Sequence, residues 1–381
     1  MVHDHMKWIE LDSESLKHNL RQFRRILGKD RKILAMVKSN AYGHGMIPIA
    51  RLAIESEADW LGVHSIKEAL ILREQGFKCP ILCVGYIPLN KLELAVQNDI
   101  RMTVYNNESI DKLGNICQET KKKAFLHIKV ETGTYRQGLS EEEFIPFIER
   151  INRHKGLVIE GLSSHFANIE DTTDHSYAKK QLHRFKSFLK QAENYGVKLK
   201  YKHMACSAAV ILFPQTYFNM TRVGIGMYGL WPSNEVFVSS LLREKPEFSL
   251  KPVLSWKARV AQIKRVPKGE FIGYGCTYKT TRESVLAVIP VGYYDGYSRS
   301  LSNIAYVLIK GKRAPVRGRV AMNFIMTDIS DIPQVKVEDT VILIGEERGD
   351  SITADKLASL TGTINYEITA RINSNIIRVL N

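Results

Sequence analysis

The sequence predicts an α/β protein with an N-terminal (β/α)8 TIM-type barrel and a C-terminal, mostly-β domain. Three observations lead to this fold class. Eight short apolar runs recur through the first 230 residues, and amphipathic helical stretches separate them. Beyond Leu230 the apolar residues alternate with a period of two, and glycines are frequent. The chain of 381 residues is also long enough for two domains that each bury a core.

The eight apolar runs of the first part have the length of buried strands. They cover residues 33–37, 60–64, 81–84, 102–105, 124–130, 157–165, 201–206 and 220–228. Between them, Ser65 with Glu68 and Ser140 with Glu143 have the spacing of a capping box, which marks the start of a helix. Helices are expected to end at three glycines, Gly76, Gly156 and Gly196.

The second part is predicted to be rich in strands. Strand-type alternation covers residues 251–266, 284–291, 305–309, 322–329 and 340–344. A helix is expected near 354–360, a last short strand near 376–380, and a linker over 232–251. We therefore expect the barrel to comprise residues 9–235 and the β-rich domain to comprise residues 1–8 and 236–381.

Composition limits the class of protein. Hydrophobic residues make up 44% and charged residues 25% of the chain, as in ordinary soluble proteins. No 18-residue apolar stretch occurs and the first eleven residues have no apolar core, so we expect neither a membrane span nor a signal peptide. The five cysteines are scattered without a C-x-x-C pair, so we expect no disulfide framework and no metal site, and a reducing, cytoplasmic location. The net charge of +14 fits a solvated basic surface that attracts small anions; nucleic acid binding is the alternative, but no binding motif supports it.

Lys38 lies in the most informative segment of the chain. It ends the first apolar run and precedes Ser-Asn-Ala-Tyr-Gly-His-Gly, a small-residue turn that could hold an amine in a cleft. A lysine at a strand end is usually a side chain that extends to solvent. A buried lysine, however, can have a lowered pKa and form a Schiff base with a carbonyl compound.

Other candidate residues follow the carboxyl ends of later strands, where barrel enzymes place their active sites. These residues are Arg136, His165, Ser207 and Arg222. Each alone has an ordinary structural interpretation, such as a surface ion pair or a helix cap. Their common placement at one end of a predicted barrel favours a functional site.

The run from Ala35 to Gly45 closely resembles the pyridoxal phosphate attachment signature of alanine racemases, and the resemblance extends from about Trp8 to Leu380. It implies that Lys38 binds pyridoxal 5'-phosphate covalently. It implies that the cofactor phosphate is held by Tyr42, Ser207, Tyr366 and the backbone amides of Gly224 and Ile225. It also implies that Arg222 faces the pyridine nitrogen and that His165 orients Arg222 or the catalytic tyrosine.

The resemblance further implies a homodimer with shared active sites. Lys38 and Tyr274 of the partner subunit are expected to be the two catalytic bases, one on each face of the substrate Cα. Arg136 and the backbone amide of Met322 from the second subunit are expected to bind the substrate carboxylate, and Lys129 matches a position that is often carbamylated. The residues expected to form or support the substrate entrance are Tyr293, Asp295, Arg299 and Glu170.

Several positions depart from the usual pattern of the family. Glu131 and Cys206 replace a usual aspartate and asparagine, and Tyr135, Gln137, Asn323 and Phe324 differ around the expected substrate pocket. We therefore expect a racemase of alanine that supplies D-alanine for peptidoglycan, with a serine or broad-specificity amino-acid racemase as the alternative. An amino-acid decarboxylase or a non-catalytic pyridoxal phosphate carrier fits less well, because Arg222 and the C-terminal domain argue against them.

Overall fold

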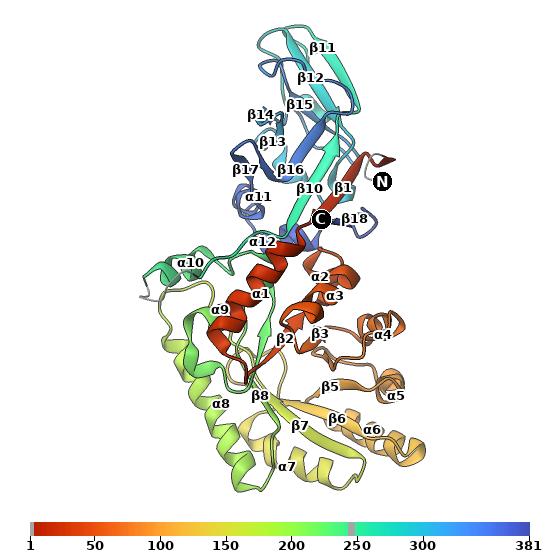
Figure 1. Ribbon diagram of the computed structural model, residues 1–381, viewed down its shortest axis with the longest axis vertical. Coiled ribbons are helices and arrows are strands. Elements are labelled where there is room, and N and C mark those ends of the chain that lie inside the picture. The colour runs from red at the N-terminus through yellow and green to blue at the C-terminus, as the bar shows by residue number, and fades with distance from the viewer. Residues whose placement is uncertain (1–3, 243–247) are drawn as a thin grey trace. The chain divides into compact units, whose positions relative to one another are not determined.

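The computed structural model describes residues 4–242 and 248–381, and it divides into two compact units. The barrel unit comprises residues 14–39 and 47–251, and the β-domain unit comprises residues 1–13, 40–46 and 252–381. Figure 1 shows the elements of both units. Residues 243–247 of the predicted linker lie outside the described part of the chain, and the domain boundaries expected from the sequence stay a prediction.

The barrel unit contains an eight-stranded parallel sheet with helices around it (Figure 1). The strand order is β8-β7-β6-β5-β4-β3-β2-β9, and the sheet is nearly closed because Arg222 N of β9 bonds Ala205 O after β8. The (β/α)8 prediction is therefore confirmed. The strands are β2 (Lys32–Met36), β3 (Trp60–Val63), β4 (Ile81–Cys83), β5 (Ile100–Val104), β6 (Ala124–Lys129), β7 (Leu157–Ser163), β8 (Tyr201–His203) and β9 (Met220–Val223).

Two helices of this part begin at signals that the sequence carries. Both predicted capping boxes form, Ser65 with Glu68 and Ser140 with Glu143. The helices are α1 (Ser13–Leu27), α2 (Lys38–Tyr42), α3 (Met46–Ser56), α4 (Ile66–Glu74), α5 (Leu92–Gln97), α6 (Asn107–Thr120), α7 (Glu141–Asn152), α8 (Ser176–Asn194), α9 (Ser207–Leu212) and α10 (Asn234–Leu241). Short 3-10 turns are η2 (Leu89–Lys91), η3 (Pro214–Thr216) and η4 (Ile225–Tyr228).

The β-domain unit contains a seven-stranded and a three-stranded sheet, which confirms a mostly-β second domain. The large sheet has the order β14-β13-β16-β10-β1-β18 with β17 on β16, and the small one has the order β11-β12-β15. The strands are β1 (Lys7–Leu11), β10 (Leu254–Arg259), β11 (Gln262–Val266), β12 (Ser284–Ile289), β13 (Tyr306–Ile309), β14 (Lys312–Pro315), β15 (Ile325–Asp328), β16 (Thr340–Glu347), β17 (Asp350–Ile352) and β18 (Arg378–Leu380). The helical segments are α11 (Ala354–Thr361), α12 (Asn365–Ala370), η5 (Tyr274–Cys276), η6 (Tyr293–Asp295) and η7 (Arg299–Leu301).

Several predicted bounds were wrong. The run 220–228 is a strand only to Val223, because Gly224 has φ −111° and ψ −110° and turns the chain into η4. Helix α7 ends at Asn152, before Gly156. The run 251–266 forms two strands in different sheets, and of the run 322–329 only Ile325–Asp328 is a strand.

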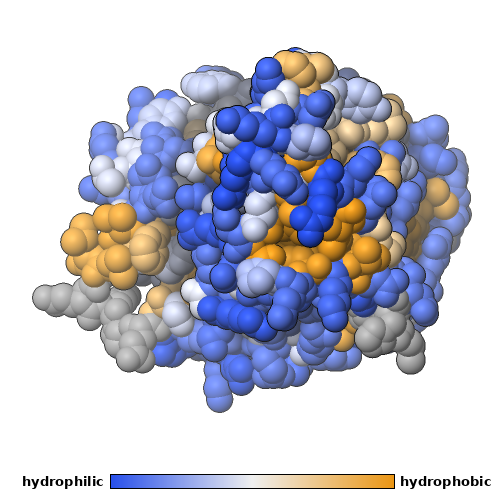
Figure 2. Space-filling model, turned by 90° about the horizontal axis from the view of Figure 1, so that it is seen from above, coloured by the Kyte–Doolittle hydropathy of each residue, from blue (hydrophilic) through white to orange (hydrophobic). Residues whose placement is uncertain are grey.

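Helix α10 lies in the segment predicted as a linker, and it exposes apolar side chains. Phe237, Val238, Leu241 and the following Leu242 are all exposed, and Trp231 packs on Phe237 with ring centroids 5.0 Å apart. The hydrophobic cluster at the left edge of Figure 2 falls where Figure 1 places α10. In the described residues, no helix is both long and apolar enough to cross a membrane.

Candidate active site

Lys38 follows β2 at the carboxyl end of the barrel sheet. The main chain is fixed there by a hydrogen bond of 2.8 Å from Val37 N to Gly62 O of β3. The side chain is partly buried, and this burial lowers the pKa of the Lys38 amine. The positive charges of Arg136 and Arg222 lower the same pKa further, whereas Glu68 opposes them. The amine is therefore easier to deprotonate than an exposed lysine.

The turn after Lys38 is left-handed, which the sequence did not indicate. Residues 39–42 all have φ of 53–54°, although none is glycine. Such a conformation costs roughly 1–2 kcal/mol for each residue, so other contacts must hold it. Ser39 N donates to the Glu68 carboxylate at 2.6 Å, and Asn40 Oδ1 accepts from Met46 N at 2.9 Å.

Arg222, in β9, is buried in the barrel with many acceptors around its guanidinium. Nη1 donates to Nδ1 of His203 at 2.6 Å and to its carbonyl at 3.1 Å. Nη2 donates to the carbonyls of Ser164 at 2.6 Å and Met204 at 3.0 Å, and it lies 3.2 Å from Nδ1 of His165. The structure thus places His165 beside Arg222. The sequence had predicted either Arg222 or the catalytic tyrosine as the partner of His165.

Ser207 begins α9 and lies against the start of η4. Its Oγ accepts hydrogen bonds from Gly224 N at 2.9 Å and from Gly226 N at 3.3 Å. The hydroxyl therefore keeps its own proton for another acceptor. The predicted phosphate ligands Ser207, Gly224 and Ile225 thus lie together on neighbouring segments, with the Gly224 amide already bonded to the serine.

Arg136 and Lys129 line one pocket with His165. Burial lowers the pKa of Lys129 well below its usual range, and the nearby charges of Arg222 and Arg136 add to this effect. Burial and these cations also lower the pKa of His165 well below its usual range. The carboxyl end of the barrel therefore gathers several cationic groups around a neutral imidazole.

Two of the three departures near Arg136 make side-chain hydrogen bonds within the chain. Glu131 anchors the loop, because its carboxylate accepts from the backbone N–H groups of Gly133 at 2.5 Å and Thr134 at 2.6 Å. Gln137 Nε2 donates to the hydroxyl of Tyr105 at 2.9 Å. Tyr135 has φ of +51° and is 81% exposed, so it packs little within this chain.

Glu170 and Cys206 contact each other in the barrel unit. The Cys206 thiol lies 3.7 Å from Oε1 of Glu170, and Ser233 Oγ donates to the Glu170 carbonyl. Burial, with the nearby Glu170 charge, raises the pKa of the Cys206 thiol to about 12. The thiol is therefore protonated at neutral pH and serves as a weak donor rather than a nucleophile.

Tyr274 lies in η5 of the β-domain and is 76% exposed. It lines a cavity of about 520 Å³ together with three other residues predicted for the site, Tyr293, Arg299 and Met322. Asn323 and Phe324, at which the sequence departs from the family pattern, line the same cavity. The β-domain thus collects the residues assigned to the second base and to the substrate entrance.

Asp295 supports this cavity from below its surface. Its carboxylate is buried, pairs with Lys7 at 2.7 Å and accepts from Gly292 N at 3.0 Å. These bonds fix the turn that carries Tyr293, whose N–H donates to Ala321 O at 3.1 Å. Asp295 is therefore a support residue of the predicted entrance rather than a residue on its surface.

Tyr42 and Tyr366 lie side by side in the β-domain unit, with ring centroids 6.1 Å apart. Gly43 packs directly on α12, which carries Tyr366, and its carbonyl accepts from the Arg378 guanidinium at 2.9 Å. These contacts bring together the two phenols predicted to hold the cofactor phosphate.

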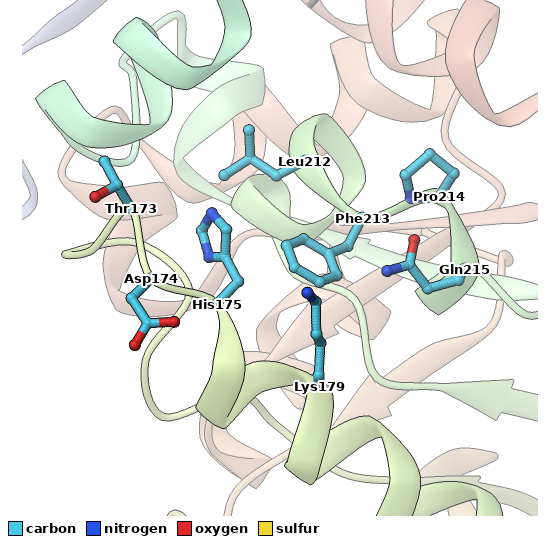
Figure 3. Close-up of a pocket in the computed structure, with 8 residues that line it drawn as sticks. All are labelled: Thr173, Asp174, His175, Lys179, Leu212, Phe213, Pro214 and Gln215. Atoms are coloured by element: carbon cyan, nitrogen blue, oxygen red, sulfur yellow. The ribbon is translucent and has the colours of Figure 1, made fainter.

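Another cavity, of about 460 Å³, lies between α8 and the end of α9 and contains none of the predicted site residues (Figure 3). His175 and Phe213 meet in it edge to face, with centroids 4.9 Å apart. Among residues 4–242 and 248–381, no group of three or more His, Cys, Asp or Glu could hold a metal ion.

Sequence reasoning missed several residues around the site. His203, His127 and Glu160 connect to Arg222 inside the barrel, and Arg319 lines the cavity of Tyr274. A signal was present for His127 and Glu160, because each is an ionisable residue within a mostly apolar strand, whereas β8, which carries His203, is Tyr-Lys-His. Arg319 lies in a loop without a recognisable pattern.

Two family models match almost the whole chain. The model of the alanine racemase N-terminal domain matches residues 11–232, and that of the C-terminal domain matches residues 253–380. The alanine racemase of Desulforamulus reducens is 40% identical over 98% of this chain and 98% of its own. The chain belongs to the alanine racemase family. Alanine racemases are isomerases, and this membership places the chain in that enzyme class.

Solved structures of this family share the fold. The alanine racemase from Bacillus anthracis, described with bound L-Ala-P, is 36% identical with a TM-score of 0.92, covering 99% of this chain and 95% of its own. A histidine racemase from Leuconostoc mesenteroides subsp. sake is 28% identical with a TM-score of 0.90, covering 99% and 98%. The fold is therefore common to racemases named for different amino acids.

Proposed function

We propose that the protein is a pyridoxal phosphate-dependent alanine racemase that interconverts L-alanine and D-alanine. The observation that carries the proposal is the amine of Lys38 at the carboxyl end of the barrel. Burial and the charges of Arg136 and Arg222 lower its pKa, and a neutral amine can form a Schiff base with an aldehyde. Membership of the alanine racemase family supports the same reaction.

The barrel residues fit this cofactor. The Ser207 hydroxyl has a proton to donate, and Ile225 begins η4 beside it, whereas the Gly224 amide already donates to the serine. The surrounding cations favour an anionic ligand. When bound, pyridoxal phosphate supplies an electron-accepting ring that stabilises negative charge at the substrate Cα. The roles assigned to Tyr42 and Tyr366 stay predictions.

Arg222 would set the electronic character of this ring. A guanidinium stays protonated, so it would donate a hydrogen bond to the pyridine nitrogen and would leave that nitrogen without a proton. The carbonyls of Ser164, His203 and Met204 hold the guanidinium in place. The resulting weaker electron sink would limit side reactions such as transamination.

Racemisation needs a base on each face of the substrate Cα. We assign Lys38 to one face and Tyr274 of the partner subunit to the other. One group removes the α-proton, and the other returns a proton to the opposite side. A phenol acts as a base near neutral pH only beside cationic groups. Arg299 and Arg319 line the same cavity as Tyr274 and could provide them.

Arg136 would bind the substrate carboxylate together with the backbone amide of Met322 from the partner subunit. Lys129 lies beside Arg136 and its lowered pKa favours a neutral amine, the form that reacts with carbon dioxide. A carbamate at this position would place a negative charge against Arg136 and orient it. We propose this modification for Lys129.

The remaining parts of the proposal concern assembly and cellular role. We propose a homodimer, because Tyr274 is exposed on its own chain and the two-base scheme needs a phenol from a second subunit. D-alanine made in the cytoplasm would supply peptidoglycan synthesis. No membrane or nucleic acid partner is part of the proposal.

A racemase of serine or of several amino acids is the second candidate. Tyr135, Gln137, Asn323 and Phe324 differ from the usual family pattern around the expected substrate pocket. The histidine racemase of the same fold supports the view that this architecture accepts other side chains.

The test is to incubate the purified protein with pyridoxal phosphate and each of a panel of L-amino acids, and to measure D-isomers by chiral chromatography. D-alanine as the main product supports the proposal, whereas D-serine or a broad spread favours the second candidate. The Lys38→Ala variant should lose Schiff-base absorbance and all racemisation. No D-isomer from any substrate, with cofactor bound, would contradict both candidates.

A further inference from the structure

The interior of the barrel contains a column of ionisable side chains. His127 of β6, Glu160 of β7, His203 of β8 and Arg222 of β9 are all buried. Barrel interiors are usually filled by branched apolar side chains. Burying polar groups is costly unless each has a hydrogen-bond partner, so the contacts among these four residues must offset that cost.

Hydrogen bonds join the four residues end to end. Arg222 Nη1 lies 2.6 Å from Nδ1 of His203, and Nε2 of His203 lies 2.8 Å from Nδ1 of His127. Nε2 of His127 lies 3.4 Å from Oε2 of Glu160. Each imidazole thus uses both of its nitrogens. The chain leads from a guanidinium at the site to a carboxylate further along the barrel interior.

The two ends allow one arrangement of protons. A guanidinium only donates, so the Arg222 end of the chain favours a bare Nδ1 and a proton on Nε2 of His203. That Nε2–H donates to His127, whose own proton must then lie on Nε2 and point to Glu160. An ionised carboxylate only accepts, which agrees with this direction.

The charge states fit the same arrangement. Burial lowers the pKa of His127 and brings that of His203 well below its usual range, so both imidazoles are neutral at pH 7. Burial alone would raise the pKa of Glu160. The hydrogen bond from His127 and the nearby cations Arg101 and Lys200 outweigh burial and lower it, so Glu160 is ionised.

Aromatic rings hold His127 in its orientation. Tyr201 stacks on the imidazole with an interplanar angle of 11° and a centroid distance of 6.0 Å, and Trp60 packs edge to face at 5.8 Å. The imidazole is therefore hindered from turning over. The position of its proton, rather than the orientation of the ring, is the property that a neighbour can still change.

We propose that Glu160 is a positioning residue for Arg222. Acting through His127, its carboxylate keeps the proton of His203 on Nε2, so that a bare Nδ1 faces the guanidinium. A reversed chain would turn an N–H of His203 toward an N–H of Arg222 and would remove that hydrogen bond. The inference rests on the proposed function only for the role of Arg222, the residue expected to face the cofactor ring.

The test compares Glu160→Gln with Arg101→Gln. Glutamine has the shape of glutamate, but its amide can either accept from His127 or donate to it, so only the Arg222 end of the chain still favours one proton arrangement. Arg101 Nε lies 3.5 Å from Glu160 Oε2. Arg101→Gln removes this ion pair but keeps the carboxylate and its hydrogen bond from His127, which lowers the pKa of Glu160 more than Arg101 does. It is therefore the matched control for any general loss of stability.

The first measurement is ¹⁵N NMR of the full-length protein labelled at histidine, with and without pyridoxal phosphate. Signals of His127 and His203 are assigned from the single variants His127→Asn and His203→Asn. We expect both imidazoles to be protonated at Nε2 in the wild type and in Arg101→Gln, and to show mixed tautomers in Glu160→Gln. A wild-type His203 protonated at Nδ1, or unchanged tautomers in Glu160→Gln, would overturn the proposal.

The second measurement is the kinetics of the loaded enzyme. Arg222 would contact the cofactor and not the substrate, so Glu160→Gln should lower kcat about tenfold while KM stays within about twofold. Glu160→Asp, which keeps the carboxylate, should recover most of the loss, and equal losses in both variants would contradict the proposal. If the wild type made no D-isomer, the proposed function would fail, but the NMR result would still decide the role of Glu160. If Glu160→Gln does not fold, the wild-type tautomers and Glu160→Asp decide it.

Discussion

Replacing Gly43 with alanine tests whether the segment after Lys38 is held by its contact with α12. Gly43 has φ of +87°, and a Cβ there would lie 1.8 Å from the carbonyl oxygen of Thr369 and 2.6 Å from its carbonyl carbon. Gly76 offers a matched control, because it has φ of +84° and a Cβ there would meet no atom within 4 Å. The two substitutions therefore share the backbone effect and differ in the contact.

The magnitude follows from these two sites. Placing alanine in the left-handed region costs about 1–2 kcal/mol at either position, and the loss of unfolded-state entropy is the same for both. At Gly43 the overlap forces the main chain and α12 apart, which adds roughly 1–3 kcal/mol. This shift also weakens the bond from Arg378 to Gly43 O, worth about 1 kcal/mol. Gly43→Ala should thus be about 2–4 kcal/mol less stable than Gly76→Ala.

The assay is urea unfolding followed by tryptophan fluorescence and far-UV circular dichroism, with stability taken from the midpoint and slope. Gly43→Ala should also weaken pyridoxal phosphate binding, because Tyr42 and Tyr366 are predicted to hold the phosphate and the overlap would separate them. Gly76→Ala should leave cofactor affinity unchanged. Equal losses of stability within about 0.5 kcal/mol would refute the argument from the Thr369 contact.

Three further predictions concern the proposed chemistry. Arg136→Gln should raise the pKa of Lys38 and move the pH midpoint of cofactor attachment upward, whereas Glu68→Gln should move this midpoint downward. Stopped-flow absorbance measures both midpoints. If the two variants shifted the midpoint in the same direction, the charge argument would be contradicted. In buffer free of carbon dioxide, Lys129→Met should raise the urea midpoint near pH 7. The pKa of Lys129 is lower in the folded protein than in the unfolded chain, so at pH 7 the unfolded wild type binds more protons and is favoured. Removing the amine removes this destabilisation, and the gain should vanish as pH rises toward about 10.4. Mixing inactive Lys38→Ala and Tyr274→Phe protomers should restore activity through one intact site, and no recovery after proven subunit exchange would exclude a shared site.

The sequence was sufficient to predict the barrel because buried parallel strands leave apolar runs that helices separate. The helical spacing of apolar residues and the capping residues then predicted where most helices lie, as the Ser65 and Ser140 capping boxes show. The placement of Lys38, Ser207 and Arg222 at one end of the sheet followed from the rule that barrel sites lie after the strands. The structure places all three there, while their chemical roles stay predictions.

Other features depend on contacts that no local pattern encodes. The left-handed turn at residues 39–42 is unfavourable for its own sequence, and distant partners such as Glu68 hold it. The pairing of Arg222 with His203, and of His127 with Glu160, depends on which strands become neighbours when the barrel closes. Ionisable residues in apolar strands indicate such a network but do not specify its members.

The charges of the barrel site argue for an anionic cofactor and an anionic substrate. Lys38, Lys129, Arg136 and Arg222 lie close enough to lower the pKa of His165 together, after burial itself. The permanent charges of Arg136 and Arg222 repel a proton on either lysine, and Glu131 of the neighbouring loop is already bonded to backbone N–H groups. A phosphate, a substrate carboxylate and a carbamate on Lys129 would each relieve this repulsion. The electrostatics of the barrel therefore favour the ligands that an amino-acid racemase with pyridoxal phosphate would bring together.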